Sequence, residues 1–415
     1  MAVYFHAMSL AWLVVDFNSY FASVEQQLDP KLRGRPIAVV PMAGVNTTCA
    51  IAASYEAKAF GVKTGTMVAD AKQKCPGIIF VQARHDEYVR YHKQLVGCIE
   101  SCLHVDHVLS IDEVACELPL NLRTREKAIA LAGKIKATIA KNAGEYLRCS
   151  IGIAPNAYLA KTATDMMKPD GLVFIEKGQL PHVLHRLTLR DLCGIGVRME
   201  SRMHEHNIYS VEQLCAATRE ELRTAWGGIE GERMWEMLRG NNVPFRAENH
   251  TTVGHSHILP PEERNDRSAC AVLNRLLQKA AMRLRNMGHL CGSLAVSVKY
   301  SNRSRWGEDI TFQETSDTVE LLRAFKKVWG RRPMTAEPPL GVGVTLFHLV
   351  HKDNATLALF HEGPGRELLN AALDALNQRY GKNSVYFAGA HEALKSAPMR
   401  IAFTHVPELR VEGDV

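Results

Sequence analysis

The stretch "LVVDFNSYFASVE", residues 13–25, joins a short apolar run to a helical pattern through a single carboxylate, Asp16. Residues 11–15 form a continuous apolar run with the length of a buried β-strand. Residues 18–27 then place Phe21 and other apolar side chains on one face, which predicts a helix. An acid at the mouth of a buried strand, followed at once by aromatic residues, therefore needs a chemical reason.

Strand and helix patterns continue to alternate through the first 175 residues. An Ala-rich segment over 52–60 predicts a helix that ends at Gly61. The segment "VLSIDEVACEL", residues 108–118, predicts one β-strand, and residues 148–154 predict another. Strands that alternate with helices in this way predict an α/β or α+β domain.

The pattern changes after about residue 175. Residues 184–238 hold short helical segments joined by glycine turns. A long amphipathic helix over 268–287 and alternating strand patterns then predict a small α+β domain. This domain is basic, since residues 251–350 carry 14 Lys and Arg against 9 Asp and Glu. The charge favours a partner rich in phosphates, although a solvated surface explains it equally well.

The composition is that of an ordinary globular protein. The 415 residues have a formal net charge of +6, and 46% of them are apolar. The apolar run over residues 8–15 is too short to span a membrane and lacks the features of a signal peptide. Because the ten cysteines include no CxxC pair, we expect free thiols in a reducing cytoplasm.

Three carboxylates lie among apolar residues: Asp16 after the first strand, and Asp112 and Glu113 within "SIDEV". Buried carboxylates are costly unless something neutralises them, and divalent cations would do so for all three. Oxygen ligands with few histidines nearby favour magnesium over zinc. The alternative is that each acid only faces solvent at a strand end. Because adjacent strand residues point to opposite faces, Asp112 and Glu113 share a metal only if the backbone bends there or the strand ends.

Five motifs follow one another along the chain: "VVDFNSYFASVE", "SYEAKAFGVKTG", "SIDEV", "SIGIAPNAYLAKTATDMMKPDG" and "GIG". Any one of them is a weak signal. Together, over roughly residues 11–350, their order and spacing resemble the Y-family of translesion DNA polymerases, of the DinB or UmuC type.

The resemblance implies an α+β multidomain fold arranged as a right-hand polymerase. It places the palm at residues 1–19 and 85–173, the fingers at 20–84, and a helical thumb with a helix-hairpin-helix motif at 174–243. An α+β little finger would follow at 250–350. Residues 351–415 would form a C-terminal tail.

The resemblance also assigns the chemistry. Asp16, Asp112 and Glu113 would be the catalytic ligands of two magnesium ions, and Phe17 would offer its backbone carbonyl. The implied reaction is template-directed addition of dNTPs to a primer 3′-hydroxyl across damaged DNA, with pyrophosphate leaving. The alternative is a non-catalytic DNA-binding or recruitment relative, but such proteins typically lose the metal carboxylates that this chain retains.

Nucleotide contacts follow from the same resemblance. Tyr55, Lys58 and Lys161 match the family's triphosphate contacts, and Tyr55 and Lys58 lie three residues apart, so they share a helix face. Many members carry Arg at the position of Lys58 and a hydroxyl residue at that of Ala52. Lysine keeps the charge but lacks the bidentate guanidinium of arginine, and Ala52 offers no hydroxyl to a phosphate. Both differences would reduce the number of hydrogen bonds to the nucleotide, which affects affinity for it.

Phe21 lies where the resemblance implies a steric gate. A bulky ring beneath the sugar leaves no room for a ribose 2′-hydroxyl, so the enzyme would choose dNTPs over NTPs. The helical pattern alone would make Phe21 an ordinary core residue.

DNA contacts are expected in two places. Gly194 and Gly196 in "GIG" resemble the hairpin of a helix-hairpin-helix motif, in which glycines allow close approach to a phosphate. A second glycine turn at 227–231 fits a paired motif. The phosphate contacts expected in the basic domain are Lys299, Arg303, Arg305, Arg331 and Arg332.

The segment "TLALF", residues 356–360, resembles the pentapeptide by which bacterial polymerases bind the sliding clamp. Leu357, Leu359 and Phe360 would be its apolar anchors. A short apolar strand is the alternative. The expected partners are thus primer–template DNA, dNTP and the clamp, for a cytoplasmic monomer that does not contact membranes.

Overall fold

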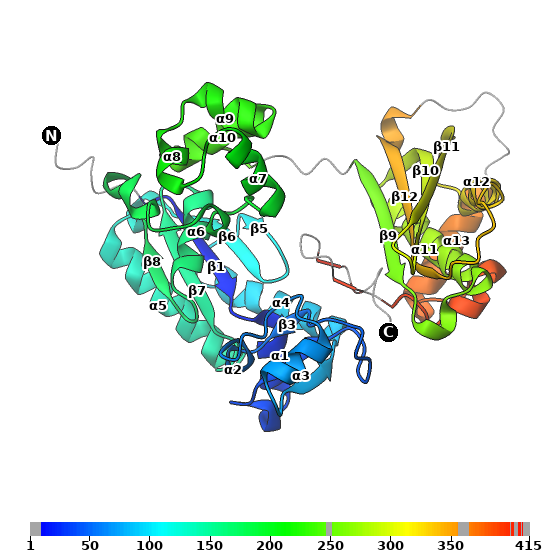
Figure 1. The fold of residues 1–415 in the computed structure, drawn as a ribbon, viewed down its shortest axis with the longest axis horizontal. Coiled ribbons are helices and arrows are strands. Elements are labelled where there is room, and N and C mark those ends of the chain that lie inside the picture. The colour runs from blue at the N-terminus through cyan, green and yellow to red at the C-terminus, as the bar shows by residue number, and fades with distance from the viewer. Residues whose placement is uncertain are drawn as a thin grey trace. The chain divides into compact units, whose positions relative to one another are not determined.

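The computed structural model describes residues 10–245, 251–355, 365–398, 400–401, 406–407 and 409 (Figure 1). The chain divides into two compact units, which are described separately. The N-terminal unit is Met1–Phe245 with Ile401–Val406, and the C-terminal unit is Arg246–Arg400 with Pro407–Val415. Within the described ranges, none of the helices combines the length and apolarity needed to cross a membrane.

The N-terminal unit is organised around a five-stranded sheet with the order β5-β6-β1-β7-β8. Its strands are β1 Trp12–Phe17, β5 His107–Val108, β6 Glu113–Glu117, β7 Cys149–Ala154 and β8 Leu172–Phe174. β1 runs antiparallel to both β6 and β7 (Figure 1). All six residues of β1 are buried, as expected for a continuous apolar run at the centre of a sheet. This places Asp16, near the end of β1, inside the unit.

Helix α6 (Ala157–Met166) packs closely on this sheet. Its Leu159, Ala160 and Ala163 share one apolar cluster with Trp12 and Val14 of β1. Helices α4 (His85–Glu100) and α5 (Arg125–Asn142) pack against each other. Because α6 packs directly on the sheet, its polar side chains can reach the end of β1.

The segment predicted as one strand over 108–118 is instead a hairpin. β5 ends at Val108 and β6 begins at Glu113, and the backbone amides of Leu109 and Ser110 both donate to the Glu113 carbonyl. Apolar and β-branched residues run through the whole segment, so its composition conceals the turn. Asp112 therefore lies in a bend and Glu113 opens a strand, which is the break in regular strand geometry that a shared site requires.

A smaller three-stranded sheet has the order β3-β2-β4. Its elements and neighbouring helices are β2 Ile37–Val40, β3 Ala52–Ala53, β4 Ile79–Gln82, α1 Tyr20–Leu28, α2 Tyr55–Lys58 and α3 Val68–Lys74. The helix predicted over 52–60 is thus only one turn long. Ala52 and Ala53 pair with β2, and the Ser54 side chain caps the helix by accepting a hydrogen bond from the Ala57 amide.

Four short helices complete the N-terminal unit: α7 Val197–Glu205, α8 Val211–Ala216, α9 Arg219–Trp226 and α10 Ile229–Leu238. Gly194 (φ +84°) lies in the turn before α7, and Gly227 (φ +73°) lies in the turn between α9 and α10. Both residues adopt the left-handed conformation that favours glycine. The apolar residues of these helices belong to the same cluster as α6, so this part of the chain has no core of its own.

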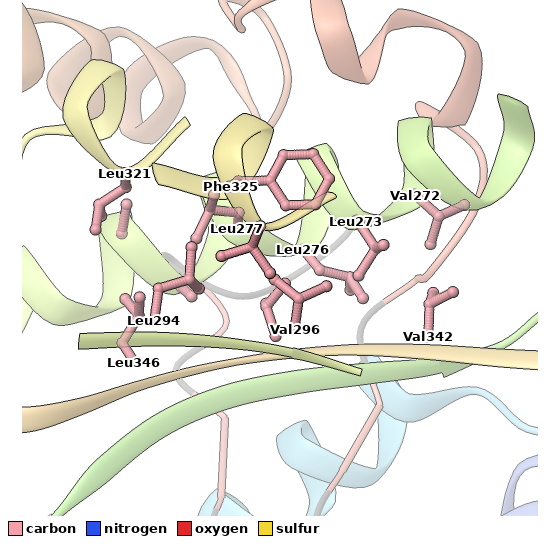
Figure 2. Packing of buried hydrophobic residues seen from close by; sticks show 14 of the residues in the cluster. Val272, Leu273, Leu276, Leu277, Leu294, Val296, Leu321, Phe325, Val342 and Leu346 are labelled. Carbon is pink, nitrogen blue, oxygen red and sulfur yellow. The ribbon is translucent and has the colours of Figure 1, made fainter. Parts of the chain in front are cut away.

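The C-terminal unit is a four-stranded antiparallel sheet with the order β11-β10-β12-β9. Its elements are β9 Thr252–Ile258, α11 Asp266–Asn286, β10 His289–Tyr300, β11 Arg305–Thr315, α12 Thr318–Trp329 and β12 Pro339–His351. Figure 2 shows Leu273, Leu276 and Leu277 of α11 directed toward the strands. The core therefore lies between one face of the sheet and the two helices.

The range predicted as a C-terminal tail contributes to this core. The 3-10 segment Ala388–Ala393 packs on α11, and Ala393 and Ala397 are buried with its apolar residues. Helix α13 spans Gly365–Tyr380. Since this part of 351–415 is packed, it is not a separate tail. The clamp-motif residues Leu357, Leu359 and Phe360 lie outside the described residues.

Candidate active site

The end of β1, the β5–β6 hairpin and helices α2 and α6 surround a pocket of about 350 Å³ in the N-terminal unit. It brings together the predicted catalytic and nucleotide-contact residues, with several that the sequence did not single out. Its lining includes Asp16, Phe17, Ser19, Phe21, Ala52, Tyr55, Lys58, Asp112, Glu113, Lys161, Asp165 and Lys168.

Asp16 is only 4% exposed, and it is paired with two lysines. Its Oδ2 atom lies 2.6 Å from Nζ of Lys161 and 2.8 Å from Nζ of Lys168. Burial opposes ionisation of Asp16, but these two ammonium groups prevail and lower its pKa below the usual value. Asp16 is therefore an anion that its own chain already neutralises.

Asp112 and Glu113 approach Asp16 from the hairpin. Glu113 lies directly opposite Asp16 in the β1–β6 register, and the Asp112 carbonyl accepts a hydrogen bond of 2.8 Å from the Phe17 amide. The Ser110 hydroxyl donates to Oδ1 of Asp112 at 2.7 Å. Burial raises the pKa of Asp112, and it raises that of Glu113 to about 7. Both carboxylates would thus gain stability from a nearby cation.

Lys161 extends from α6 into the space between the carboxylates. Its Nζ atom lies 2.7 Å from Oε1 of Glu113 and 3.2 Å from Oδ2 of Asp165. Burial disfavours the charged lysine, but Asp16, Glu113 and Asp165 raise its pKa above the usual value. One lysine therefore bridges three carboxylates.

Lys168 and Asp165 were not predicted as site residues. Nζ of Lys168 lies 2.7 Å from Oδ1 of Asp165 and also contacts Asp16. The sequence offered a signal, because Lys161, Asp165 and Lys168 are spaced four and three residues apart in "KTATDMMK". The ion pairs that Lys161 and Lys168 form with Asp16 depend on the tertiary fold and have no sequence signature.

The oxygen atoms of Asp16, Asp112 and Glu113 are suitable ligands for divalent cations. In this structure, Asp16 and Glu113 are paired with lysine ammonium groups instead. Among the residues that the structure describes, no three Asp, Glu, His or Cys side chains stand close enough to hold a metal ion. Lys161 instead lies between Asp16 and Glu113. Magnesium prefers oxygen ligands, and the three acidic side chains supply carboxylate oxygens. Burial raises the pKa of Asp112 and Glu113, so a bound cation would stabilise their ionised forms.

Tyr55 and Lys58 face the same pocket from α2. Nζ of Lys58 lies 4.4 Å from the centroid of the Tyr55 ring and donates to the Ser19 hydroxyl at 2.7 Å. Burial lowers the pKa of Lys58 and raises that of Tyr55. The two side chains do share a face, as their spacing predicts. Ser19, whose φ of +48° is unusual for a residue with a side chain, was not predicted as a partner of Lys58.

Phe21 is buried at 4% exposure and also lines the pocket. Its ring stacks on that of Tyr88, with centroids 4.4 Å apart and planes at 15°. Phe21 is thus both a packed core residue and part of the pocket lining. Its position is therefore compatible with a core role and with a steric gate.

A buried polar network supports the loop that carries Lys168. The Asn18 amide group donates to the Ser150 hydroxyl at 3.1 Å, and its carbonyl oxygen accepts from the Asp170 amide at 2.7 Å. The Ser150 hydroxyl also accepts from the Gly171 amide. Because Asn18 and Asp16 lie on the same stretch, this network fixes Lys168 relative to the carboxylate that it neutralises.

The residues predicted to contact DNA lie in turns or near strand ends, and all but Lys299 and Arg332 are exposed. Gly196 precedes α7 directly, and a side chain built at Gly194 would meet no atom within 4 Å. In the C-terminal unit, Arg303 lies in the turn between β10 and β11, and Arg305 is exposed at the start of β11. Lys299 is opposite Arg305 in the β10–β11 register, so these cations share one face of the sheet.

Arg332 has a structural role instead of the predicted contact with phosphate. Its side chain is only 6% exposed and forms an ion pair with Asp266. It donates to the Tyr300 hydroxyl at 3.0 Å and stacks on the ring of Trp329 at 4.5 Å. The neighbouring Arg331 is half exposed and lies 3.6 Å from Glu308. The two adjacent arginines differ in the burial of their side chains, which could not be predicted from the sequence.

Comparison with known proteins identifies the class. A model of the impB/mucB/samB family matches residues 15–165, and the model of that family's C-terminal domain matches residues 250–359. DNA polymerase IV of Moorella thermoacetica is 30% identical over 382 residues, covering 91% of this chain and 95% of that protein. DNA polymerase IV 1 of Bacillus subtilis is 28% identical and covers 88% and 90%.

Solved structures agree on the fold. A Y-family polymerase chimera of Dbh and Dpo4 has a TM-score of 0.70 at 23% identity, covering 82% of this chain and 99% of its own. DinB from Sulfolobus solfataricus has a TM-score of 0.53 at 23% identity, with coverage of 82% and 99%. At these identities the likeness shows the fold alone.

The sequence matches make this chain a DNA-directed DNA polymerase of the translesion class. It belongs to the Y-family, and its relatives named DNA polymerase IV place it with the DinB type. The predicted family and the α+β polymerase fold are therefore confirmed.

Proposed function

We propose that the pocket at the end of β1 adds dNTPs to a primer 3′-hydroxyl on template DNA, with Asp16, Asp112 and Glu113 binding two magnesium ions. The observation that carries this proposal is the convergence of all three carboxylates with the predicted nucleotide contacts in one pocket. Two related solved structures are an insertion ternary complex and a post-insertion binary complex of Dbh DNA polymerase, which supports DNA and nucleotide as the ligands of this fold.

Within this pocket the carboxylates provide the binding charge. When bound, two divalent cations activate an attacking oxygen and stabilise a leaving one in phosphoryl transfer. Asp16 and Glu113 lie opposite each other, and Asp112 joins them from the bend before β6. Phe17 follows Asp16 on β1, and we assign its backbone carbonyl to the same ligand set.

Four side chains are suited to the triphosphate. Tyr55 and Lys58 offer a hydroxyl and a charge from α2, while Lys161 and Lys168 offer two further charges. Asp165 pairs with both Lys161 and Lys168, so it keeps them in the pocket when Asp16 takes other partners. Ala52 lines the pocket without offering a hydroxyl, and Lys58 gives a point charge instead of a fork.

Phe21 is assigned as the steric gate. Its buried ring lines the pocket that holds the carboxylates, and its stacking on Tyr88 opposes displacement. A fixed ring at this place excludes a ribose 2′-hydroxyl by steric clash.

The remaining assignments concern DNA and the arrangement of domains. The palm comprises residues 1–19 and 85–173, the fingers 20–84, the thumb 174–243 and the little finger 250–350. Gly194, Gly196 and the glycine turn at residues 227–228, which leads into α10, contact the DNA backbone in the thumb. The exposed or half-exposed cations that do so in the little finger are Lys299, Arg303, Arg305 and Arg331. Contacts to phosphate suit an enzyme that must accept any sequence.

We further propose that the chain acts as a monomer in the cytoplasm and binds the sliding clamp through residues 356–360. Leu357, Leu359 and Phe360 would fill an apolar pocket on the clamp. Deleting these five residues should remove stimulation of synthesis by the clamp and leave unstimulated synthesis unchanged. Equal stimulation of the deleted and parent chains would contradict the assignment.

Primer extension with magnesium on damaged and undamaged templates tests the catalytic proposal. The parent should extend both templates, and Asp112→Ala should lose extension because one arm of the cation site is gone. Ser110→Ala is the matched control, since it removes only the hydroxyl that supports Asp112 and should retain measurable synthesis. Absence of extension by the parent would favour the non-catalytic relative instead.

A further inference from the structure

Behind Phe21 lies a buried carboxylate, paired with a half-exposed arginine, that the proposed chemistry does not use. Glu25 of α1 has 0% exposure, although it is a carboxylate in the middle of a helix. Arg84 precedes α4 directly, and Tyr88 lies in the first turns of that helix with its side chain fully buried. These three residues link the helix that carries Phe21 to the start of α4.

Glu25 is held from two directions. Nε of Arg84 donates to Oε1 and Oε2 of Glu25 at 3.2 and 3.1 Å, and Nη2 of Arg84 also donates to Oε2. The Tyr88 hydroxyl donates to Oε1 of Glu25 at 2.7 Å. Bidentate pairing with arginine fixes the plane of a carboxylate, so the acceptor offered to Tyr88 has a defined position.

Tyr88 is fixed at its backbone as well. Its carbonyl oxygen accepts a hydrogen bond of 2.5 Å from the hydroxyl of Tyr20, which neighbours Phe21 on α1. With its hydroxyl and its backbone both bound, the Tyr88 ring has little freedom to rotate or withdraw. It is this ring that stacks on Phe21 at 4.4 Å and 15°.

The contacts form a continuous chain from Arg84 through Glu25 and Tyr88 to the wall of the pocket. A buried carboxylate costs more free energy than an apolar side chain of similar size, so packing alone does not account for Glu25. What an apolar residue would not supply is a directional acceptor for the Tyr88 hydroxyl. The arrangement therefore controls the orientation of the Phe21 ring as well as filling space.

We propose that Glu25, Arg84 and Tyr88 are positioning residues for sugar selection. They hold the Phe21 ring at the height that excludes a ribose 2′-hydroxyl, without touching the nucleotide themselves. This inference rests on the proposed steric gate and extends it to three residues behind the gate. Without this support the Phe21 ring can move aside for a ribose 2′-hydroxyl. Selection of dNTPs over NTPs then weakens, while nucleotide addition continues.

The measurement is the ratio of kcat/KM for dCTP to that for CTP, opposite guanine in primer extension. This ratio isolates sugar selection, because a loss of folded enzyme lowers both values equally. Tyr88→Ala removes the stacked ring and should lower the ratio about tenfold. Tyr88→Phe and Glu25→Gln keep the ring but weaken its anchor, and each should lower the ratio about threefold.

Two further variants calibrate the experiment. Leu95→Ala removes a fully buried side chain about two helical turns beyond Tyr88 in α4, which matches the loss of packing at a distance from the stacked rings. It should leave the ratio at the parent value. Phe21→Ala removes the gate itself and should give the lowest ratio of the set.

The outcomes separate this inference from the gate assignment. A ratio that falls in Phe21→Ala but stays at the parent value in all three variants of Tyr88 and Glu25 would overturn the inference and leave the gate standing. An unchanged ratio in Phe21→Ala would show that Phe21 is no gate, and the inference would fall with it. If Tyr88→Ala does not fold, the two milder variants decide the question.

Discussion

At the scale of single residues, the site depends on one irregularity of the backbone. Asp112 and Glu113 are adjacent, yet both reach the pocket because the hairpin turns at residues 109–112 and β6 begins only at Glu113. The sequence predicted the three carboxylates together with Tyr55 and Lys161 in this pocket. It did not predict the bend, because a turn within an apolar, β-branched segment resembles a strand.

Lys168 shows what sequence reasoning missed. Its ion pair with Asp16 spans 152 residues of chain, so no local pattern contains it. We expect Lys168→Ala to raise the KM for dNTP about tenfold with a smaller effect on kcat, because one charge near the triphosphate is lost. Steady-state primer extension measures both constants.

Lys127 serves as the control for this prediction. It is exposed on α5, donates to the Asn121 carbonyl and does not line the pocket, so Lys127→Ala should leave both constants unchanged. An equal effect of the two substitutions, or an effect of Lys168→Ala on kcat alone, would contradict the assigned role.

At the scale of elements, close packing constrains the short helices that follow α6. A Cβ atom added to Gly231 of α10 would lie 1.9 Å from the Leu222 carbonyl oxygen of α9, and other backbone atoms lie within 2.6 Å. Since backbone cannot move aside cheaply, we expect Gly231→Ala to lower the free energy of unfolding by about 1–3 kcal/mol. Chemical denaturation of the two proteins provides the measurement.

Gly97 is the matched control, because it is also a helical glycine. It lies in α4, and a Cβ atom added there would meet nothing within 4 Å beyond its chain neighbours and the backbone of its own helix. Gly97→Ala should raise the free energy of unfolding by about 0.5–1 kcal/mol, since alanine restricts the unfolded chain and favours helix. If Gly231→Ala is as stable as the parent or more stable, helix α10 does not pack on α9 as described.

Elements also show where prediction from sequence reaches its limit. The long helix α11 was predicted to within two residues, because many periodic positions define it. The helix predicted over 52–60 was largely wrong, since Ala52 and Ala53 join a sheet through contacts with a strand more than ten residues away. Short elements contain too few residues for their own pattern to outweigh tertiary pairing.

At the scale of the whole molecule, a buried histidine makes the stability of the C-terminal unit depend on pH. His257 in the C-terminal unit is 7% exposed, and burial together with Arg400, Lys279 and Arg275 lowers its pKa to about 4. The unfolded state takes up a proton below its ordinary pKa of 6.5, whereas the folded state does not. The stabilisation is therefore complete above about pH 6.5 and is lost as the pH falls toward 4.

We expect His257→Gln to remove this dependence. Between pH 7.5 and 5.0 the parent should lose about 2 kcal/mol of unfolding free energy that the variant retains. Urea denaturation at both values measures the difference, and His206→Gln, exposed in the N-terminal unit, is the control. A parallel decline in His257→Gln and the parent would place the pH sensitivity elsewhere.

We expect the arginines of the C-terminal unit to divide between binding DNA and stabilising the fold. If Arg303 and Arg305 contact phosphates of duplex DNA, replacing both with alanine should reduce the slope of log K against log salt by about 1.8. Arg332→Ala should leave that slope unchanged and destabilise the unit, because its buried side chain joins Asp266 and Tyr300. Fluorescence anisotropy with a labelled primer–template measures the slopes, and a reduced slope in Arg332→Ala would contradict the division.

The pairing of Asp16 and Glu113 with Lys161 has a practical consequence for handling the enzyme. In proteins built around a structural ion, removing that ion unfolds the chain. Here the charges that would drive unfolding already have internal partners. A chelator should therefore stop synthesis yet leave the melting temperature unchanged, and a fall in melting temperature on chelation would disprove this. The folded protein can then be stored without magnesium, and DNA synthesis can be started by adding the ion.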